Sequence, residues 1–241
     1  MTPRILGLDI ESLPGEAYIW RLGKQYVGLP QLKRPARVCM IGAKWIGTRE
    51  PVITYDERGR GKDLGMMQRA HALICKADAV VTYNGDGFDL PWLRGAMAEY
   101  ELAPLPPVIS IDLYKTVRKF RLMSNKLAYV APLLQIGQKV KTEGLDLWLE
   151  CLAGDKRAWG RMRTYNTQDL RLLDRGYLRL RPYIQNHPRL YPSDKTRPTC
   201  GSCGAAAIVY RGTYRTLTMT YDRGQCQECG KWDNKLNGRR T

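Results

Sequence analysis

Acidic residues occur in three widely separated blocks of this chain, each next to a stretch that favours regular structure. The blocks are Asp9-Ile10-Glu11, Phe88-Asp89, and Tyr165-Asn166-Thr167-Gln168-Asp169. Strand residues two apart, like helix residues four apart, lie on one face, so Asp9 can point with Glu11 and Tyr165 with Asp169. Four carboxylates gathered in one fold repel one another unless cations neutralise them. The blocks therefore predict a fold that collects these acids around two divalent metal ions.

The order of apolar patterns predicts an α/β domain. Short apolar runs indicate strands, whereas apolar residues at helical spacing indicate helices. A Pro- and Gly-punctuated stretch, residues 12–37, predicts an irregular arm. Strands first and mostly helices later are typical of a central mixed sheet flanked by helices. The expected strands are 4–10, 38–46, 51–55, 79–83 and 108–113; the expected helices are 64–77, 90–100 and much of 116–181, most strongly 156–180.

The charge of the chain points to a polyanionic partner. Its 39 Lys and Arg against 23 Asp and Glu give a formal net charge of +16. Such an excess favours nucleic acid, because contacts with phosphates release counterions and dominate affinity. No run approaches the roughly 18–20 apolar residues needed to span a membrane. The N-terminus also lacks the apolar core of a signal peptide, so we expect a cytoplasmic protein with no membrane partner.

Four of the seven cysteines predict a zinc site near the C-terminus. Cys200 and Cys203 form one C-x2-C pair, and Cys226 and Cys229 form another after 22 intervening residues. Four thiolates at this spacing suit one tetrahedral, structural Zn²⁺. Residues 208–210 and 217–221 between the pairs are expected to be strands of a zinc ribbon. The other three, Cys39, Cys75 and Cys151, are interpreted as reduced core residues.

Together, the three acidic blocks resemble the proofreading 3′–5′ exonuclease domain of family-B DNA polymerases. That domain belongs to the ribonuclease H-like exonucleases named for an Asp-Glu-Asp-Asp tetrad. The motif Tyr-x-x-x-Asp at Tyr165 and Asp169 places the chain in the tyrosine branch of that superfamily. The resemblance spans about residues 5–185 and implies an exonuclease domain at 1–186. The prolines that follow predict a linker at 187–197, and the cysteine pairs predict a zinc ribbon at 198–241.

The resemblance also implies roles for individual residues. Asp9 would bridge two Mg²⁺ or Mn²⁺ ions, Glu11 and Asp169 would complete the water-activating site, and Asp89 would support the other ion. Tyr165 would orient the attacking water; its ordinary pKa near 10 favours a neutral, hydrogen-bonding role. The terminal nucleotide and its strand would contact four further residues, Asn84, Phe88, Asn125 and Lys126. The nearby Asp86 is interpreted as a solvated turn residue, and Asp112 as a weaker candidate behind the metal ligands.

We expect the protein to be a metal-dependent 3′–5′ exonuclease that acts on DNA, with single-stranded DNA as the expected substrate. An RNA exonuclease of the same fold and a catalytically silent nucleic-acid-binding adaptor are the alternatives. Interleaved tyrosines and arginines between the cysteine pairs suit the ribbon to nucleic-acid binding or to partner docking. Partners in replication or repair are expected. Single-chain relatives with a C-terminal zinc ribbon are familiar among bacteriophage-encoded proteins, which would place this one in the host cytoplasm.

Overall fold

A five-stranded sheet centred on β1 (Ile5–Leu13) forms the body of the computed structural model, which describes residues 2–49, 53–56, 64–142, 144–192 and 198–240. The strand order is β5-β4-β1-β6-β7. On one side, β4 (Arg37–Trp45) pairs with β1 and β5 (Ile53–Asp56) with β4, both antiparallel. On the other side, β6 (Ala79–Thr82) and β7 (Ile109–Asp112) run parallel to β1.

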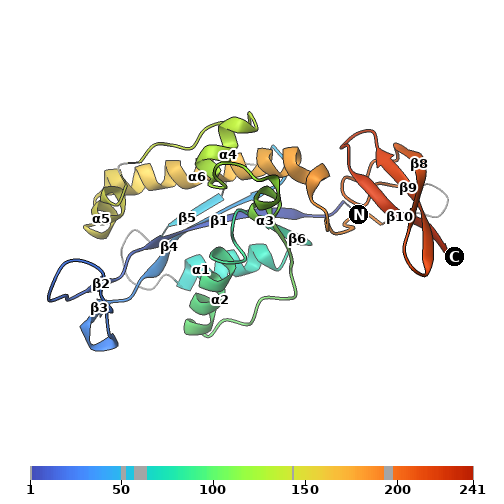
Figure 1. Ribbon diagram of the computed structural model, residues 1–241. Helices are drawn as coiled ribbons and strands as arrows, with labels where there is room; N and C mark the ends of the chain where they lie inside the picture. Colours follow the sequence, from blue (N-terminus) through green and yellow to red (C-terminus); the bar gives the residue numbers. More distant parts are fainter. Residues whose placement is uncertain (1, 50–52, 57–63, 143, 193–197, 241) are drawn as a thin grey trace.

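Helices cover both faces of the sheet (Figure 1). One face carries α1 (Leu64–Ile74) and α2 (Asp89–Glu99), and the other carries the long α6 (Lys156–Leu180). Shorter helices accompany α6: α3 (Leu113–Val117), α4 (Leu127–Leu133) and α5 (Asp146–Leu152). This arrangement confirms the predicted α/β fold with a mixed sheet flanked by helices. Among the described residues, no helix is long and apolar enough to cross a membrane.

Side-chain alternation along β1 decides where the acids point. Leu6, Leu8 and Ile10 join the apolar cluster that packs against α1 and α2. Asp9 and Glu11 therefore point to the opposite face, under α6. Two separate apolar clusters hold α6 on that face, one around Leu170 and Leu173 and one around Trp159 and Met162. The acids of β1 lie between these clusters.

Several expected boundaries differ from the observed ones. β1 continues to Leu13 because β4 pairs with it as far as that residue, so Asp9 and Glu11 lie inside the strand and not at its end. The arm contains a short hairpin of β2 (Glu16–Ala17) and β3 (Leu32–Arg34), with a 3-10 turn, η1 (Leu29–Gln31), between them. Much of 116–181 is helical as expected, but η2 (Arg118–Phe120) and two connections, 121–126 and 134–142, separate the α-helices. Residues 51 and 52 of the expected strand 51–55 lie outside the described residues.

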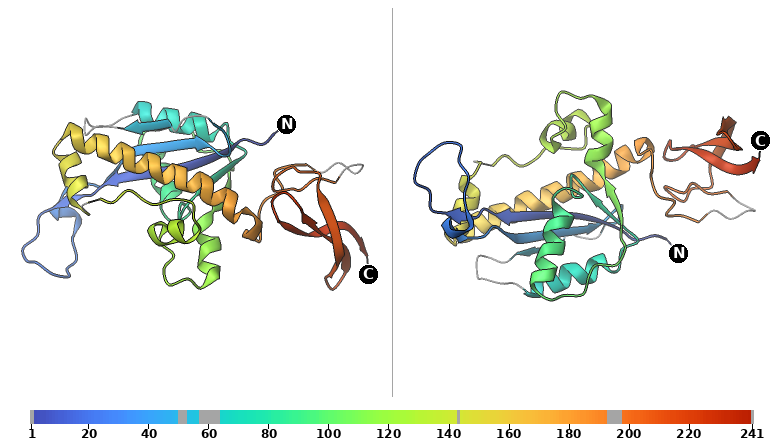
Figure 2. Two further views of the ribbon diagram at one scale, coloured as in Figure 1. Left: turned by 90° about the horizontal axis from the view of Figure 1, so that it is seen from above. Right: turned by 60° about the horizontal axis from the view of Figure 1, so that its bottom comes forward.

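The C-terminal module is a three-stranded antiparallel sheet of β8 (Ile208–Arg215), β9 (Met219–Cys226) and β10 (Trp232–Arg240). The third strand was not expected from the sequence. The module follows η3 (Arg181–Tyr183) at the end of α6, and Figure 2 shows it at the opposite end of that helix from the arm. Residues 193–197 of the expected linker lie outside the described residues, and the three-part division of the chain stays a prediction.

Candidate active site

Three of the four predicted acids meet between β1 and α6. Asp9, Glu11 and Asp169 each offer a carboxylate oxygen, and these oxygens lie within 4.8 Å of one another. Glu11 and Asp169 are buried, with 8% and 4% of their surface exposed. The second carboxylate oxygen of Asp169, Oδ1, is buried and accepts no hydrogen bond among the described residues. Buried oxygen donors held this close, one without a partner, are suited to hard divalent cations.

Asn166 fixes the position of Asp9. Its Nδ2 donates hydrogen bonds to Asp9 Oδ2 at 2.8 Å and to the Asp9 carbonyl at 3.3 Å. The two elements can approach because Gly42, which pairs with Asp9 across the sheet, has no side chain. A Cβ at Gly42 would lie 2.0 Å from Asn166 Oδ1 and 2.5 Å from Leu170 Cδ1. The site therefore depends on a glycine in a strand that carries no acid.

Asp89 lies against the same strand but not in the three-carboxylate cluster. Its Oδ1 accepts a hydrogen bond of 2.9 Å from the backbone N–H of Ile10, between Asp9 and Glu11. β6 pairs with β1 only at Ile5, Leu6 and Gly7, so this edge of β1 has no parallel neighbour beyond Gly7. Asp89 thus accepts a hydrogen bond from an N–H at the edge of β1 beyond its pairing with β6, and its charge is close enough to raise the pKa of Asp9. Its place as a ligand of the second ion stays a prediction.

Crowding and burial favour the protonated forms of these acids when no metal is bound. Burial, with repulsion from Glu11, Asp89 and Asp169, raises the pKa of Asp9 well above its ordinary value. Burial and the charge of Asp169 raise the pKa of Glu11 to about 8, and burial raises the pKa of Asp89 to about 6. The pKa of Asp169 is also raised, by burial. Divalent cations would reverse these shifts, because they stabilise the charged forms.

Lys139 supplies a cation to the cluster that sequence reasoning missed. Its Nζ lies 2.7 Å from Asp169 Oδ2 and donates to the Tyr165 hydroxyl oxygen at 2.8 Å. Burial alone would lower its pKa, but Asp169 and Tyr165 outweigh burial and raise it. Burial also raises the pKa of Tyr165, so the phenol is neutral near pH 7. Because the ammonium only donates, the hydroxyl proton of Tyr165 is free for another acceptor.

The turn after β6 presents two of the predicted substrate contacts. Asn84 is exposed and adopts a left-handed conformation with φ of 69°. Asp112 shapes the turn by accepting hydrogen bonds from the backbone N–H groups of Asn84 and Tyr114, at 2.7 and 3.0 Å. The Phe88 ring is 37% exposed beside α2. Asp86 is paired and not simply solvated, because it contacts Lys115 Nζ at 2.5 Å.

The other two predicted contacts lie beside this turn. Tyr83, the residue before Asn84, donates a hydrogen bond of 2.6 Å from its hydroxyl to the Asn125 carbonyl oxygen. Lys126 is exposed and precedes α4. Residues of the basic segment before them are exposed as well: Lys115, Arg118, Lys119 and Arg121. The structure thus places a cationic surface next to the turn that carries Asn84 and Phe88.

The four C-terminal cysteines gather in a second candidate metal site. Their sulfur atoms all lie within 4.8 Å of one another, with 3.7 Å between Cys200 and Cys229 and 3.6 Å between Cys203 and Cys226. Tetrahedral Zn²⁺ with Zn–S bonds of about 2.3 Å would place sulfurs roughly 3.8 Å apart. The donors and their spacing therefore fit Zn²⁺. Of the other three cysteines, Cys39 and Cys151 are buried as expected, but Cys75 is exposed because it follows the end of α1, so its core assignment was wrong.

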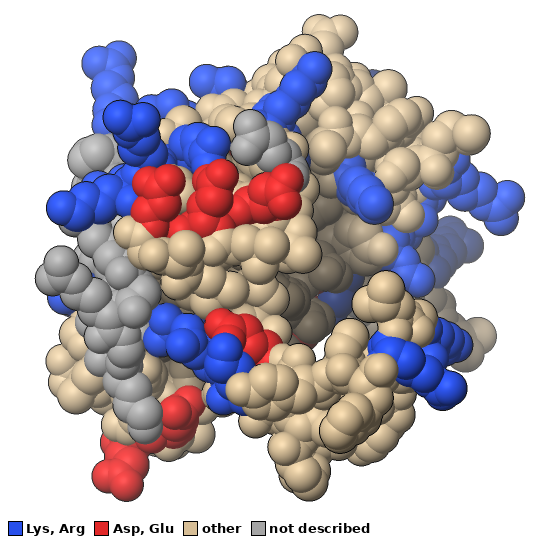
Figure 3. Space-filling model, turned by 90° about the vertical axis from the view of Figure 1, so that its left-hand side faces the viewer, with Lys and Arg blue, Asp and Glu red and all other residues tan. Residues whose placement is uncertain are grey.

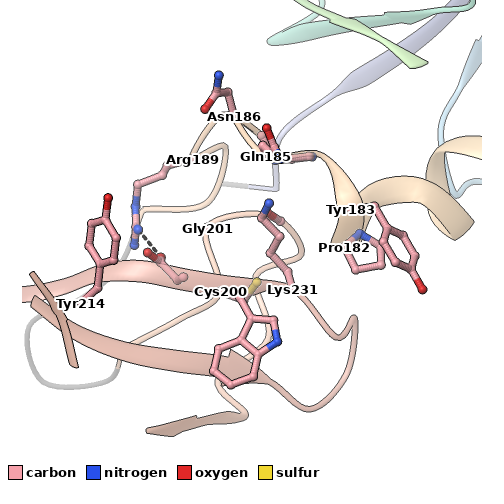
Figure 4. A pocket seen from close by; sticks show the side chains of 13 residues that line it. Pro182, Tyr183, Gln185, Asn186, Arg189, Cys200, Gly201, Tyr214 and Lys231 are labelled. Atoms are coloured by element: carbon pink, nitrogen blue, oxygen red, sulfur yellow. Dashed lines mark hydrogen bonds and ion pairs between the residues drawn. The ribbon is translucent and has the colours of Figure 1, made fainter. Parts of the chain in front are cut away.

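A groove of about 660 Å³ separates the module from the end of α6. Figure 4 shows Tyr183 on one side, Tyr214 on the other, and Lys231 between them. Lys231 Nζ donates a hydrogen bond to the Ile184 carbonyl, and Arg189 in the segment after η3 forms an ion pair with Asp233 of β10. Beneath it, the Tyr177 hydroxyl lies 2.8 Å from His187 Nε2. These contacts join the module to the body.

Comparison with known proteins identifies the fold of the body. A family model described as the RNase H superfamily matches residues 31–179, more than half of the chain. No curated protein sequence matches the chain.

A solved structure shares the fold at low sequence identity. The family B DNA polymerase from the hyperthermophilic archaeon Pyrobaculum calidifontis is 18% identical and superposes with a TM-score of 0.58. The match covers 75% of this chain and 25% of the polymerase, so the chain spans about a quarter of that protein.

Proposed function

Because the chain belongs to the RNase H superfamily, we propose that it is a two-metal-dependent 3′–5′ exonuclease that hydrolyses phosphodiester bonds of DNA, with single-stranded DNA as its main substrate. The observation that carries this proposal is the cluster of Asp9, Glu11 and Asp169, with carboxylate oxygens within 4.8 Å of one another. A basic chain with a net charge of +16 has no structural use for buried, mutually repelling acids unless they bind cations.

In this proposal Asp9, Glu11, Asp89 and Asp169 hold two Mg²⁺ or Mn²⁺ ions. When bound, such ions activate a water molecule and stabilise the oxygen that leaves the phosphate. Asn166 keeps the Asp9 carboxylate directed at the cluster through the hydrogen bond at 2.8 Å. The hydrogen bond from Ile10 N–H leaves Asp89 one oxygen that is not engaged with β1.

Tyr165 orients the attacking water. Lys139 donates to its oxygen, which holds the phenol in place and leaves the phenol proton for the water. The ring of Trp148 packs edge-on against Tyr165 at 6.0 Å between centroids, which further limits its motion. The raised pKa of Tyr165 supports positioning over base catalysis.

A 3′-terminal nucleotide would bind at the turn after β6. Phe88 offers an exposed ring for base stacking, Asn84 offers an amide, and the segment with Asn125 and Lys126 lies beside them. Base stacking on aromatic rings tolerates many sequences, as a degrading enzyme requires. RNA is the alternative substrate, since recognition of the 2′-hydroxyl depends on the contacts that the nucleotide makes at this turn.

The C-terminal module would be a zinc ribbon that assists substrate binding or docks a replication or repair partner. The fit of the cysteine sulfurs to tetrahedral Zn²⁺ supports the zinc assignment. The groove between the module and the end of α6 is lined by Lys231 and by three exposed rings, Tyr183, Tyr214 and Trp232. Rings beside a cation support a role in nucleic-acid binding.

Hydrolysis of end-labelled oligonucleotides tests the proposal. Wild-type protein should shorten 5′-labelled single-stranded DNA with Mg²⁺ or Mn²⁺ and not with EDTA, and a parallel RNA substrate measures preference. Asp9→Asn should lower the rate by at least about 10³-fold, since it removes a charge that the metal site requires. The matched control Asp146→Asn changes an exposed acid on α5 and should retain the wild-type rate. Metal-dependent binding without hydrolysis of either substrate would favour a silent adaptor.

A further inference from the structure

The arm formed by residues 14–36 exposes an unusual number of large apolar side chains. Trp20 is 97% exposed, Leu22 91% and Tyr26 90%. Five more exposed apolar residues belong to the same arm: Tyr18, Ile19, Val27, Leu29 and Leu32. Soluble proteins rarely leave apolar groups concentrated in this way unless the surface binds something.

Polar contacts give the arm a defined backbone shape although its large apolar side chains are exposed. Gln31 bridges its two limbs: Gln31 Nε2 donates to the Tyr18 carbonyl at 3.0 Å, and Gln31 Oε1 accepts from Gly28 N–H at 2.9 Å. The backbone N–H of Tyr18 donates in turn to the Gln31 carbonyl. At the base, Glu16 pairs with Lys33 and Arg34. These contacts fix the two ends of the loop that carries Trp20 and Tyr26, which lowers the entropic cost of presenting its rings to a ligand.

The positive charge of the arm favours binding of a polyanion. From residue 17 to residue 36 there are four cations, Arg21, Lys24, Lys33 and Arg34, and no acid. Arg21 and Lys24 are exposed on either side of Leu22, between Trp20 and Tyr26. Rings interleaved with cations match the bases and phosphates of single-stranded nucleic acid. A second copy of the same arm would bring like charges together, which disfavours self-association.

The arm also leaves the sheet next to the acidic cluster. Leu13 and Arg37 form the last pair between β1 and β4, two residues beyond Glu11 along β1. Figure 3 views the molecule from this end and shows a hollow bordered largely by uncharged residues, with lysine and arginine side chains to either side and acidic side chains on the same face. A strand with its end at the acids can therefore continue onto the arm.

We propose that the arm is a binding site for the single-stranded part of the substrate, in which Trp20 and Tyr26 stack on bases while Arg21 and Lys24 contact phosphates. This inference rests on the proposed nuclease function and adds to it a second contact with the strand, away from the reacting phosphate. It gives long strands an affinity that very short ones do not have.

Binding measurements without hydrolysis test the arm. Fluorescence anisotropy without added Mg²⁺ or Mn²⁺ and without a chelator, so that bound zinc is kept, uses a single-stranded oligonucleotide of about 20 nucleotides. It should show about tenfold weaker binding for Trp20→Ala and for Tyr26→Ala, about 1.4 kcal/mol each. Trp20→Phe keeps a ring and should lose less. Leu145→Ala is the matched control, since Leu145 is an exposed apolar residue that belongs neither to the arm nor to the C-terminal module. These exposed positions should leave the melting temperature unchanged.

The outcomes separate this inference from the proposed function. Trinucleotide hydrolysis should proceed at the wild-type rate in Trp20→Ala. If the wild-type protein hydrolyses DNA and the double variant Trp20→Ala/Tyr26→Ala binds the oligonucleotide with unchanged affinity, the arm is not a binding site, whereas the nuclease proposal stands. If binding depends on the two rings but the wild-type protein hydrolyses neither DNA nor RNA, the nuclease proposal is wrong and the binding site on the arm stands. A dimer in sedimentation that Trp20→Ala dissociates would assign the arm to a second copy instead.

Discussion

Gly42 allows α6 to lie close enough to β1 for Asn166 to reach Asp9. The contact is tight: a Cβ at Gly42 would overlap both Asn166 Oδ1 and Leu170 Cδ1. Asn166 is fully buried, and its Nδ2 bonds to the carboxylate and the carbonyl of Asp9. A change at position 42 therefore alters the geometry of the carboxylate cluster without replacing any of its acids.

We expect Gly42→Ala to lower both stability and activity. Overpacking of this kind costs about 1–3 kcal/mol, which corresponds to a melting temperature roughly 3–10 °C lower. Gly160→Ala, on an open face of α6 with nothing near its added methyl group, is the matched control and should be neutral or slightly stabilising. Equal melting temperatures for the two variants would contradict the close packing of α6 on β4.

The raised pKa of Glu11 makes the metal-free protein sensitive to pH. Folding raises this pKa from 4.5 to about 8. Below pH 4.5 the carboxyl is protonated in both states, and between about 4.5 and 8 the unfolded chain releases the proton first. Stability is therefore present at low pH and is lost as the pH rises through this window. A divalent cation bound at the cluster would favour the charged carboxylate and oppose this loss of stability.

Melting curves at a series of pH values measure this effect. The difference in melting temperature between samples with and without Mg²⁺, both with zinc retained and neither with a chelator, should widen by roughly 5–10 °C from pH 4.5 to pH 8. Glu11→Gln, which cannot ionise, should remove much of the widening. Parallel curves for the wild type with and without metal would show that Glu11 is not held in a metal site.

Residue spacing predicted part of the site and could not predict the rest. The spacing of Asp9 with Glu11 and of Tyr165 with Asp169 follows from strand and helix geometry, and the structure brings three of these acids together. Asn166 had a usable signal, since it lies three residues before Asp169 on the same helix face. Lys139 had none, because it lies in an irregular connection that only tertiary packing brings to Asp169.

The elements of the body followed their local patterns where packing agreed with them. β6, β7 and α6 lie within one or two residues of the expected ranges. β1 is longer than its apolar run because β4 pairs along it past the acids. The hairpin of the arm was missed because its residues are exposed and show no apolar alternation, and backbone bonds with Gln31 define it instead.

The C-terminal module should depend on zinc. Its strands expose much of their surface, so the metal site must replace a hydrophobic core. Cys203→Ser should lose bound zinc and the hydrogen-exchange protection of β8, β9 and β10, while α6 keeps its protection. Cys75→Ser changes an exposed cysteine outside the cluster and should keep a full equivalent of zinc. Protected strands in zinc-free protein would contradict a structural metal.

In the whole molecule, the clustered acids lie between β1 and α6, inside a chain with an excess of cations. The arm and the C-terminal module lie at opposite ends of α6 (Figures 1 and 2), with the cluster of Asp9, Glu11 and Asp169 between them. A net charge of +16 attracts the substrate, and bound metal would make the repelling acids compatible with a phosphate. Binding should accordingly weaken steeply as salt rises.

The direction of degradation tests the central claim most directly. The measurement compares one single-stranded DNA labelled at its 5′ end with the same strand labelled at its 3′ end, under Mg²⁺ and in single turnover. A 3′–5′ exonuclease releases the 3′ label at once as a mononucleotide and leaves a 5′-labelled ladder that shortens one nucleotide at a time. Early release of the 5′ label, or internal fragments from both substrates, would contradict it.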